Sequence, residues 1–264
     1  MNKPGVILLS FVILTLASMG EANPQEAAAR PSWSGLWDKA KELENHGSYL
    51  EAEEIYETLL HRKIRSARAR RSIHKGYETL QIKIIFSEVE TPDSLFHTVI
   101  SGDTLFELAK KYGTTIELLQ RSNKLSSDKI YPGMKLKVTR LKFSMVVEKG
   151  SNRLILLADG QPLKNYPVAT GIGGSTPAGS FKIMNKLKDP TWFHPGGAVP
   201  PESPQNILGS RWLGFDPAGY GIHGTTLPKT IGTQASKGCI RMLNSDVEEI
   251  YTLVPIGTSV TIRD

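Results

Sequence analysis

The stretch SKGCIRM, residues 236–242, contains Cys239, the only cysteine among the 264 residues of the chain. Residues 1–22 have a weakly positive start, an apolar core from Val6 to Met19 and small residues after it, which is typical of an export signal. Exported proteins use cysteines in pairs because their compartment oxidises thiols. A single thiol there is either buried and inert or retained for its reactivity, and the neighbouring residues must decide.

The neighbours of Cys239 supply what a reactive thiol needs. A thiol attacks as its thiolate and requires a base, and His223 in the stretch GIHGT (221–225) ends a predicted strand sixteen residues earlier. Gly238 lets the backbone approach a ligand closely, so the amides of Gly238 and Cys239 can donate to an oxyanion. Arg241 can hold a substrate carboxylate. These residues would allow covalent catalysis at Cys239, but a lone cysteine and a histidine at this separation are weak evidence by themselves, so a buried, inert thiol stays the alternative at this point.

The sequence around this site predicts a mostly-β domain. From Phe143 onward apolar residues recur with a period of two, interrupted by turn residues such as Lys149-Gly150-Ser151-Asn152. One helix is predicted from Ser245 to Leu253, capped by Asn244 or Ser245. The predicted strands are 143–148, 153–158, 163–169, 180–186, 219–223 and 258–263. Strands of this number and spacing favour a sandwich or partly closed barrel.

Residues 32–86 have the spacing of amphipathic helices, and a third helix is predicted from Ser66 to Ile85. The run at 36–62 resembles a single tetratricopeptide repeat with Gly47 and Ala52 at its tight packing positions; a plain helical spacer is the alternative. The densest basic run, Arg62 to Lys75, we interpret as a solvated helix face. Whether this region has a protein partner stays open.

Residues 97–138 predict a βααβ unit. Its strands are expected at 97–100 and 135–138, with a first helix capped by Ser101 or Asp103 and a second capped by Thr114. The stretches SGDTL, LAKKYG and IYPGMKL resemble a lysin motif (LysM) over the whole module. That resemblance implies binding of N-acetylglucosamine-containing glycans between the loop Gly102-Asp103-Thr104 and the segment around Ile130. The alternative is a fold kept as a spacer.

The stretches GIHGT and SKGCIRM, with VATGIGGSTPAGSFKI before them, resemble the L,D-transpeptidase catalytic-domain family over residues 143–263. The resemblance implies that Cys239 is the nucleophile and His223 the general base, oriented by the backbone carbonyl of Gly224. It implies that Ser236 and Arg241 shape the site and bind substrate. Lys237 departs from the family pattern, where many members have a second histidine, and we expect its cation to favour the thiolate.

The same resemblance implies peptidoglycan as the partner and substrate. The expected reaction is L,D-transpeptidation of tetrapeptide stems; L,D-carboxypeptidation and a catalytically inactive wall-binding scaffold are the alternatives. We expect no cofactor, and no metal, because the six histidines lack metal-ligand spacing. His194 is expected to be a lid or packing residue. The net charge of +6 favours an anionic partner, but the basic residues do not form an aromatic-lined stripe, so nucleic acid is not expected.

The sequence thus predicts a multidomain chain. Its parts are a signal peptide (1–22), a helical tetratricopeptide-like region (32–88), a LysM domain (97–139) and a catalytic domain (143–264). The protein is expected in the periplasm or cell wall, with anchoring by an uncleaved N-terminal segment as the alternative.

Overall fold

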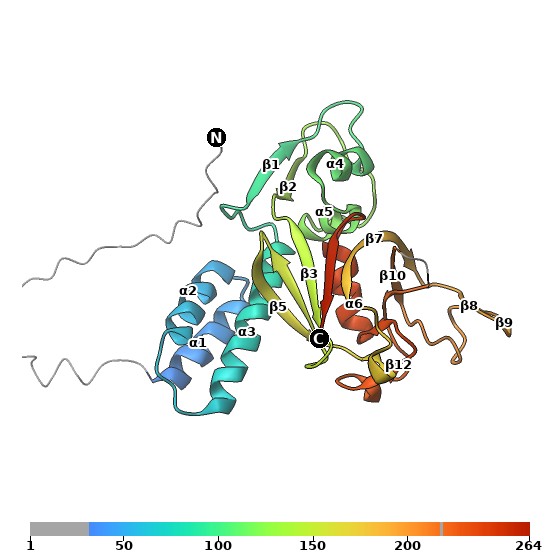
Figure 1. Cartoon of the computed structure of the whole chain (residues 1–264). Coiled ribbons are helices and arrows are strands. Elements are labelled where there is room, and N and C mark those ends of the chain that lie inside the picture. The colour runs from blue at the N-terminus through green and yellow to red at the C-terminus, as the bar shows by residue number, and fades with distance from the viewer. Residues whose placement is uncertain (1–31, 217–218) are drawn as a thin grey trace, which may run out of the picture.

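The computed structural model describes residues 32–216 and 219–264, so the predicted signal peptide lies outside the described residues. Three parts follow one another along the chain (Figure 1): a helical region, a small βααβ module and a larger, mostly-β domain. This arrangement confirms the predicted fold class. None of the helices in the two described ranges is long and apolar enough to cross a membrane.

The helical region consists of α1 (Trp33–Asn45), α2 (Tyr49–Leu60) and α3 (Ala67–Ile85). Tyr56 is fully buried at its centre, and its hydroxyl donates to Glu44 Oε1 at 2.7 Å. Glu44 also forms ion pairs with Lys41 at 2.8 Å and with Lys83 at 2.7 Å. A buried carboxylate with three partners thus joins the last turns of α1 and α3, which therefore run parallel to each other.

The expected packing positions of this region are correct at Ala52 and wrong at Gly47. Ala52 is fully buried. Gly47 has a φ of +78° and open space where a Cβ would lie, so it is a turn residue between α1 and α2. The close helix contact is at Gly76 instead, where a Cβ would lie 2.5 Å from the Tyr56 hydroxyl. The third helix begins as predicted, with Ser66 Oγ accepting from Ala69 N at 3.2 Å.

The βααβ module contains β1 (Ser94–Thr98), α4 (Leu105–Tyr112), α5 (Ile116–Ser122) and β2 (Lys135–Thr139). Its first strand starts earlier than predicted because Ser94 pairs with Thr139 at the far end of β2. Leu105, Leu108, Leu119 and Val138 are among the residues of its own small core.

Both helix caps in this module differ from the prediction by one residue. Thr104 caps α4, its Oγ1 accepting from Glu107 N at 3.2 Å. Asp103, one of the expected caps, instead accepts from Ile100 N at 2.9 Å in the preceding turn. Thr115, not Thr114, caps α5 by accepting from the amide of the third residue after it at 2.9 Å. Several adjacent residues in each stretch can cap a helix, so the sequence did not decide which of them is the N-cap.

The larger domain is built on an eight-stranded sheet in the order β13-β11-β10-β7-β14-β3-β4-β5. The helix α6 (Asn244–Leu253) packs against it with Val247 and Ile250 fully buried. The strands are β3 (Phe143–Glu148), β4 (Arg153–Ala158), β5 (Gln161–Pro167), β7 (Gly179–Lys188), β10 (Arg211–Phe215), β11 (Gly221–His223), β13 (Ile240–Arg241) and β14 (Ser259–Arg263).

Six short strands of this domain were not predicted. Two of them, β10 and β13, belong to the main sheet, and two form a hairpin, β8 (Trp192–His194) with β9 (Gly197–Val199). The other two are β6 (Thr170–Gly171) and β12 (Gln234–Ser236). Each is at most five residues long, too short for a period of two to stand out. A further two-stranded pairing joins β6 to β12 in parallel. The hairpin and this pairing lie on the side of the domain that contains Cys239.

The three parts share buried surface. Ile82 and Ile85 of α3 and Leu118 of α5 belong to the same buried cluster as the strands of the main sheet. Lys137 of β2 is buried, and its Nζ donates to the carbonyls of Ile84 at 2.9 Å and Ser87 at 2.8 Å at the end of α3. Burial lowers the pKa of Lys137 to about 8. The βααβ module therefore packs against both the helical region and the larger domain, which also contact each other directly.

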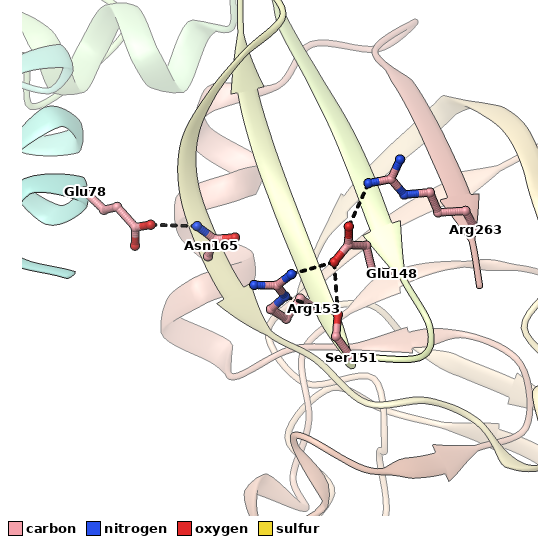
Figure 2. A network of polar contacts seen from close by, with 6 residues as sticks. All are labelled: Glu78, Glu148, Ser151, Arg153, Asn165 and Arg263. Carbon is pink, nitrogen blue, oxygen red and sulfur yellow. Dashed lines mark hydrogen bonds and ion pairs between the residues drawn. The ribbon is translucent and has the colours of Figure 1, made fainter. Parts of the chain in front are cut away.

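Polar contacts also connect the helical region to the sheet and link neighbouring strands of the sheet (Figure 2). Asn165 of β5 donates to Glu78 of α3 at 2.6 Å, which ties the helical region to the sheet edge. Glu148 accepts from Arg153 and from Arg263, each at 2.7 Å, and so connects the ends of β3, β4 and β14. These contacts hold the half of the sheet that is remote from Cys239.

Lys137→Ala should lower the free energy of unfolding by about 2–4 kcal/mol, because it removes a buried aliphatic stem and two hydrogen bonds to carbonyls. Urea denaturation followed by circular dichroism measures the loss. Lys135→Ala, on the same strand but exposed, is the matched control and should change little. Equal midpoints for the two variants would show that Lys137 does not hold the parts together.

Candidate active site

The site is assembled by two adjacent parallel strands. β11 and β13 pair with Ile222 opposite Ile240 and His223 opposite Arg241. Both isoleucines are fully buried, which fixes the register of the pair. Cys239 directly precedes β13, two residues before Arg241, so the strand geometry places its side chain on the same face. The thiol, the imidazole and the guanidinium therefore share one end of the sheet.

The Cys239 thiol is neutral at neutral pH. Its Sγ lies 3.5 Å from the carbonyl oxygen of Gly219 and can donate to it. Burial raises the pKa of the thiol, while the backbone amide of Gly221 and the charge of Arg241 act in the opposite direction. Arg241, rather than Lys237, is the cation that lowers this pKa, and the Lys237 side chain is exposed.

His223 is held as a neutral base. Only 2% of its surface is exposed, and its Nδ1 lies 2.7 Å from the carbonyl oxygen of Gly224. Because a carbonyl only accepts, Nδ1 carries the proton and Nε2 has a free lone pair. Burial, with a smaller contribution from the charge of Arg241, lowers the pKa of the imidazole to about 4, although backbone hydrogen bonds of Gly224 and Leu208 act in the opposite direction. The ring stacks on Trp212 with 5.9 Å between centroids.

Arg241 is a buried cation that lacks a carboxylate partner. It is 8% exposed, and its Nε has no hydrogen-bond partner among the described residues. Its backbone is fixed on both sides, since it exchanges two hydrogen bonds with Ala169 at 2.8 and 2.9 Å and pairs with β11. A buried guanidinium needs charge-assisted hydrogen bonds to offset its desolvation. The arrangement fits a carboxylate supplied by a ligand.

Ser236 and Gly238 shape the loop that presents the thiol. The Ser236 hydroxyl donates to the carbonyl of Cys239 at 2.6 Å and accepts from the amide of Gly238 at 3.1 Å. Gly238 has a φ of +131°, and a Cβ there would lie 2.8 Å from the ring of Tyr220. The Ser236 side chain is thus engaged within its own loop, and the Gly238 amide, expected to face an oxyanion, donates to it.

These residues open into a cavity of about 390 Å³. His223, Ser236, Cys239 and Arg241 line its floor together with Lys237 and Gly219. Sequence reasoning missed its walls, which are largely apolar: Leu187, Pro190, Thr191, Trp192, Phe193, Ile207, Leu208 and Trp212. Two adjacent aromatic residues in a predicted loop, Trp192 and Phe193, were the one signal available. An apolar wall around a few convergent polar groups is typical of a ligand site.

The wall is held by a buried amide. Asn206 is almost fully buried, and its Nδ2 donates to the carbonyl of Pro190 at 2.8 Å, with Val199 and Pro200 oxygens at 3.3 and 3.2 Å. Its Oδ1 accepts from Leu208 N at 2.9 Å. One side chain thus fixes both ends of the segment 190–208, which contains the β8–β9 hairpin. No motif marks Asn206 in the sequence.

Asn244 plays a similar part behind His223. It was predicted as a cap of α6, but Leu243 occupies the cap position and makes no side-chain cap. The Asn244 Oδ1 accepts instead from Thr225 N at 3.0 Å and Ser210 N at 3.3 Å. It therefore holds the chain that follows His223 against the strand β10.

His194 lies outside the cavity. Its ring stacks on Trp192 with 4.3 Å between centroids, within the hairpin. Among residues 32–216 and 219–264 no group of three or more His, Cys, Asp or Glu side chains is placed to hold a metal ion.

The predicted glycan-binding residues lie in the βααβ module, and none of them lines the cavity at Cys239. Asp103 lies 2.7 Å from His97 Nε2, and Tyr112 contacts the other ring nitrogen at 2.9 Å, so the Gly102 loop is braced from inside. Thr104 caps α4 and Ile130 is half-buried. Exposed apolar side chains that the sequence reasoning did not select surround them: Ile100, Phe106 and Tyr131.

Comparison with known proteins identifies two parts of the chain. The YkuD family, described as the L,D-transpeptidase catalytic domain, matches residues 142–262. The LysM domain family matches residues 97–139.

Two relatives from Bacillus subtilis strain 168 are similar over most of their own length. The protein named "Putative L,D-transpeptidase YkuD" is 36% identical over 177 residues, which cover 64% of this chain and 99% of that protein. "Putative L,D-transpeptidase YqjB" is 38% identical over 126 residues, covering 46% of this chain and 70% of that protein. The chain therefore belongs to the L,D-transpeptidase family and carries a LysM domain beside its catalytic domain.

Proposed function

We propose that this protein is a peptidoglycan L,D-transpeptidase that cross-links tetrapeptide stems through a thioester on Cys239. The observation that carries the proposal is the cavity in which the Cys239 thiol, the His223 imidazole and the unpaired Arg241 guanidinium meet. A nucleophile, a base with a fixed tautomer and a carboxylate-binding cation are the groups that acyl transfer from a stem peptide requires.

In the first step the sulfur attacks the carbonyl carbon of the third residue of the donor stem. His223 Nε2 takes the thiol proton as the C–S bond forms, because Nδ1 is already committed to Gly224. The bond between the third residue and the terminal D-alanine then breaks. His223 passes the proton to the leaving amine, and the acyl group remains on Cys239 as a thioester.

In the second step an amine of another stem attacks the thioester. Its proton goes to His223 and then to the Cys239 sulfur as the C–S bond breaks, which restores the starting state. The acyl energy is conserved in the thioester, so the exchange needs no external energy source. With water as acceptor the same site would act as a carboxypeptidase.

Different groups bind the carboxylate of the donor stem and the oxyanion of the tetrahedral intermediate. Arg241 binds the carboxylate of the donor stem, the charge-assisted pair that its buried guanidinium lacks. The amides of Gly238 and Cys239 stabilise the oxyanion of the tetrahedral intermediate. Since Gly238 N donates to Ser236 Oγ at 3.1 Å, the role of Ser236 includes holding that amide in place until substrate arrives.

The LysM domain binds the glycan strands of the same polymer, with Gly102, Asp103, Thr104 and Ile130 around its groove. Its rigid attachment to the catalytic domain, through Lys137 and the shared core, supports a fixed distance between glycan and cavity. A wall polymer as substrate places the protein outside the cytoplasm.

Purified tetrapeptide muropeptides should be converted to cross-linked dimers with release of D-alanine, as measured by mass spectrometry of the products. His223→Gln should slow this reaction about 10²–10⁴-fold, because the thiol loses its base. His46→Gln, an exposed histidine of the helical region, is the matched control and should have no effect. Tripeptide monomers alone would identify a carboxypeptidase, and no turnover at all would indicate a scaffold.

The alkylation of Cys239 by iodoacetamide should rise about tenfold per pH unit between pH 6 and 9, since only the thiolate reacts and burial raises the pKa of this thiol. Arg241→Gln should move the curve to higher pH, because Arg241 lowers that pKa. Pseudo-first-order rates from intact-protein mass give the profile. A rate that is flat from pH 5 to 8 would mean a preformed thiolate–imidazolium pair and would contradict the neutral pair described above.

A further inference from the structure

The loop before α3 and its first half carry a concentration of positive charge. Seven lysines and arginines lie between residues 62 and 75, and no Asp or Glu lies between Glu57 and Glu78. Glu78, the first acid after the run, accepts a hydrogen bond from Asn165 of the sheet (Figure 2). The sequence alone predicts only a solvated helix face here.

Four of these cations form a surface that we call the basic end: Lys63, Arg65, Arg68 and Arg71. All four are exposed, and none forms an ion pair with a described residue. Arg68 and Arg71 are three residues apart and so lie on one face of α3. Ala69 and Ile73, on the opposite face, are buried in the helical region. The charges therefore project away from the fold.

The positive charges of the basic end destabilise the isolated protein. The first turn of α3 contains no acidic residue, although the positive end of the helix dipole lies there and disfavours cations. Four neighbouring like charges also repel one another. Nothing among the described residues offsets these terms, whereas an anionic surface in contact with the basic end would.

The position of the basic end indicates which anionic surface it meets. Glu44 and Lys83 pair at the last turns of α1 and α3, so the first turns of both helices lie together at the opposite end of the region (Figure 1). The chain enters α1 at Trp33. The apolar run from Val6 to Met19 precedes this point in the sequence. The basic end thus lies beside the start of α1, the point at which an uncleaved apolar segment would join the fold.

Trp33 adds an amphipathic side chain at the same end. It is 40% exposed although it is the first residue of a helix that buries its other aromatic residue more deeply. Tryptophan with flanking Lys and Arg is typical of surfaces that lie at a membrane–water boundary. We propose that the basic end and Trp33 dock on a bilayer surface rich in anionic lipid headgroups. This contact is independent of the chemistry at Cys239.

The test is co-sedimentation of the protein, as recovered after export, with phosphatidylcholine vesicles that do or do not contain phosphatidylglycerol. The wild-type protein should bind the anionic vesicles and bind the neutral ones far more weakly. The triple variant Arg65→Gln, Arg68→Gln, Arg71→Gln should lose about a hundredfold in affinity for the anionic vesicles. The control triple Lys135→Gln, Lys182→Gln, Lys188→Gln removes the same charge from exposed positions elsewhere and should lose less than about threefold.

Turnover of soluble stems should be the same for both triples and the wild type, because all six side chains are exposed. In thermal melting by circular dichroism the control triple should match the wild type and the basic-end triple should melt no lower, since it loses the repulsion among the cations. Equal loss of vesicle binding in the two triples would show that net charge alone attracts the protein, and would overturn the proposal. So would equal binding to neutral and anionic vesicles. Binding of soluble inorganic polyphosphate through the basic end without binding of anionic vesicles would assign this surface to an anionic polymer, and the membrane proposal would be wrong.

Discussion

The parallel pairing of β11 with β13 is the constraint on which the rest of the site depends. Ile222 opposite Ile240 fills the core below, and the same register puts His223 opposite Arg241 above. A slip by one residue would turn His223 into the core and the isoleucine into the cavity. Ala169 holds β13 from its other side through two backbone hydrogen bonds. The position of Cys239 therefore follows from backbone pairing and core packing.

Burial gives this site its electrostatic character. It raises the pKa of Cys239 and lowers that of His223 to about 4, so both groups are neutral at rest and Arg241 is the one buried charge beside them. A proton transfer within such a pair has to accompany the attack on substrate. A carboxylate from the substrate would neutralise Arg241 and complete the charge balance. The apolar wall of the cavity, which Asn206 holds in place, screens charges only weakly. The attraction between Arg241 and a substrate carboxylate would therefore be stronger there than in water.

The sequence predicted what depends on local patterns and missed what depends on distant contacts. Period-two strands, the third helix and the stretches around His223 and Cys239 each carry their signal within a few residues. The caps at Thr104 and Thr115 were misplaced by one residue because several adjacent residues can cap a helix. Asn206 and Asn244 act on carbonyls and amides that are remote in the sequence, so no window around them shows their role.

The packing between the parts of the chain also depends on distant contacts that the sequence does not reveal, and Lys137 is an example. A lysine in a strand with alternating apolar residues is expected to face solvent. Lys137 is instead buried against the end of α3. Its burial makes the LysM domain part of the body of the protein, so the surface of that domain and the cavity at Cys239 keep a fixed relation to each other. The succession of a helical region, a βααβ module and a mostly-β domain was predicted, but their mutual packing was not.

Intact-protein mass spectrometry after brief incubation with a tetrapeptide stem and an acid quench tests the central claim, that Cys239 carries the acyl group. The account predicts a mass increase equal to the tripeptide acyl group, located on the peptide that contains Cys239, released by hydroxylamine and absent from Cys239→Ala. Product formation by Cys239→Ala, or an acyl group attached to any other residue, would contradict it.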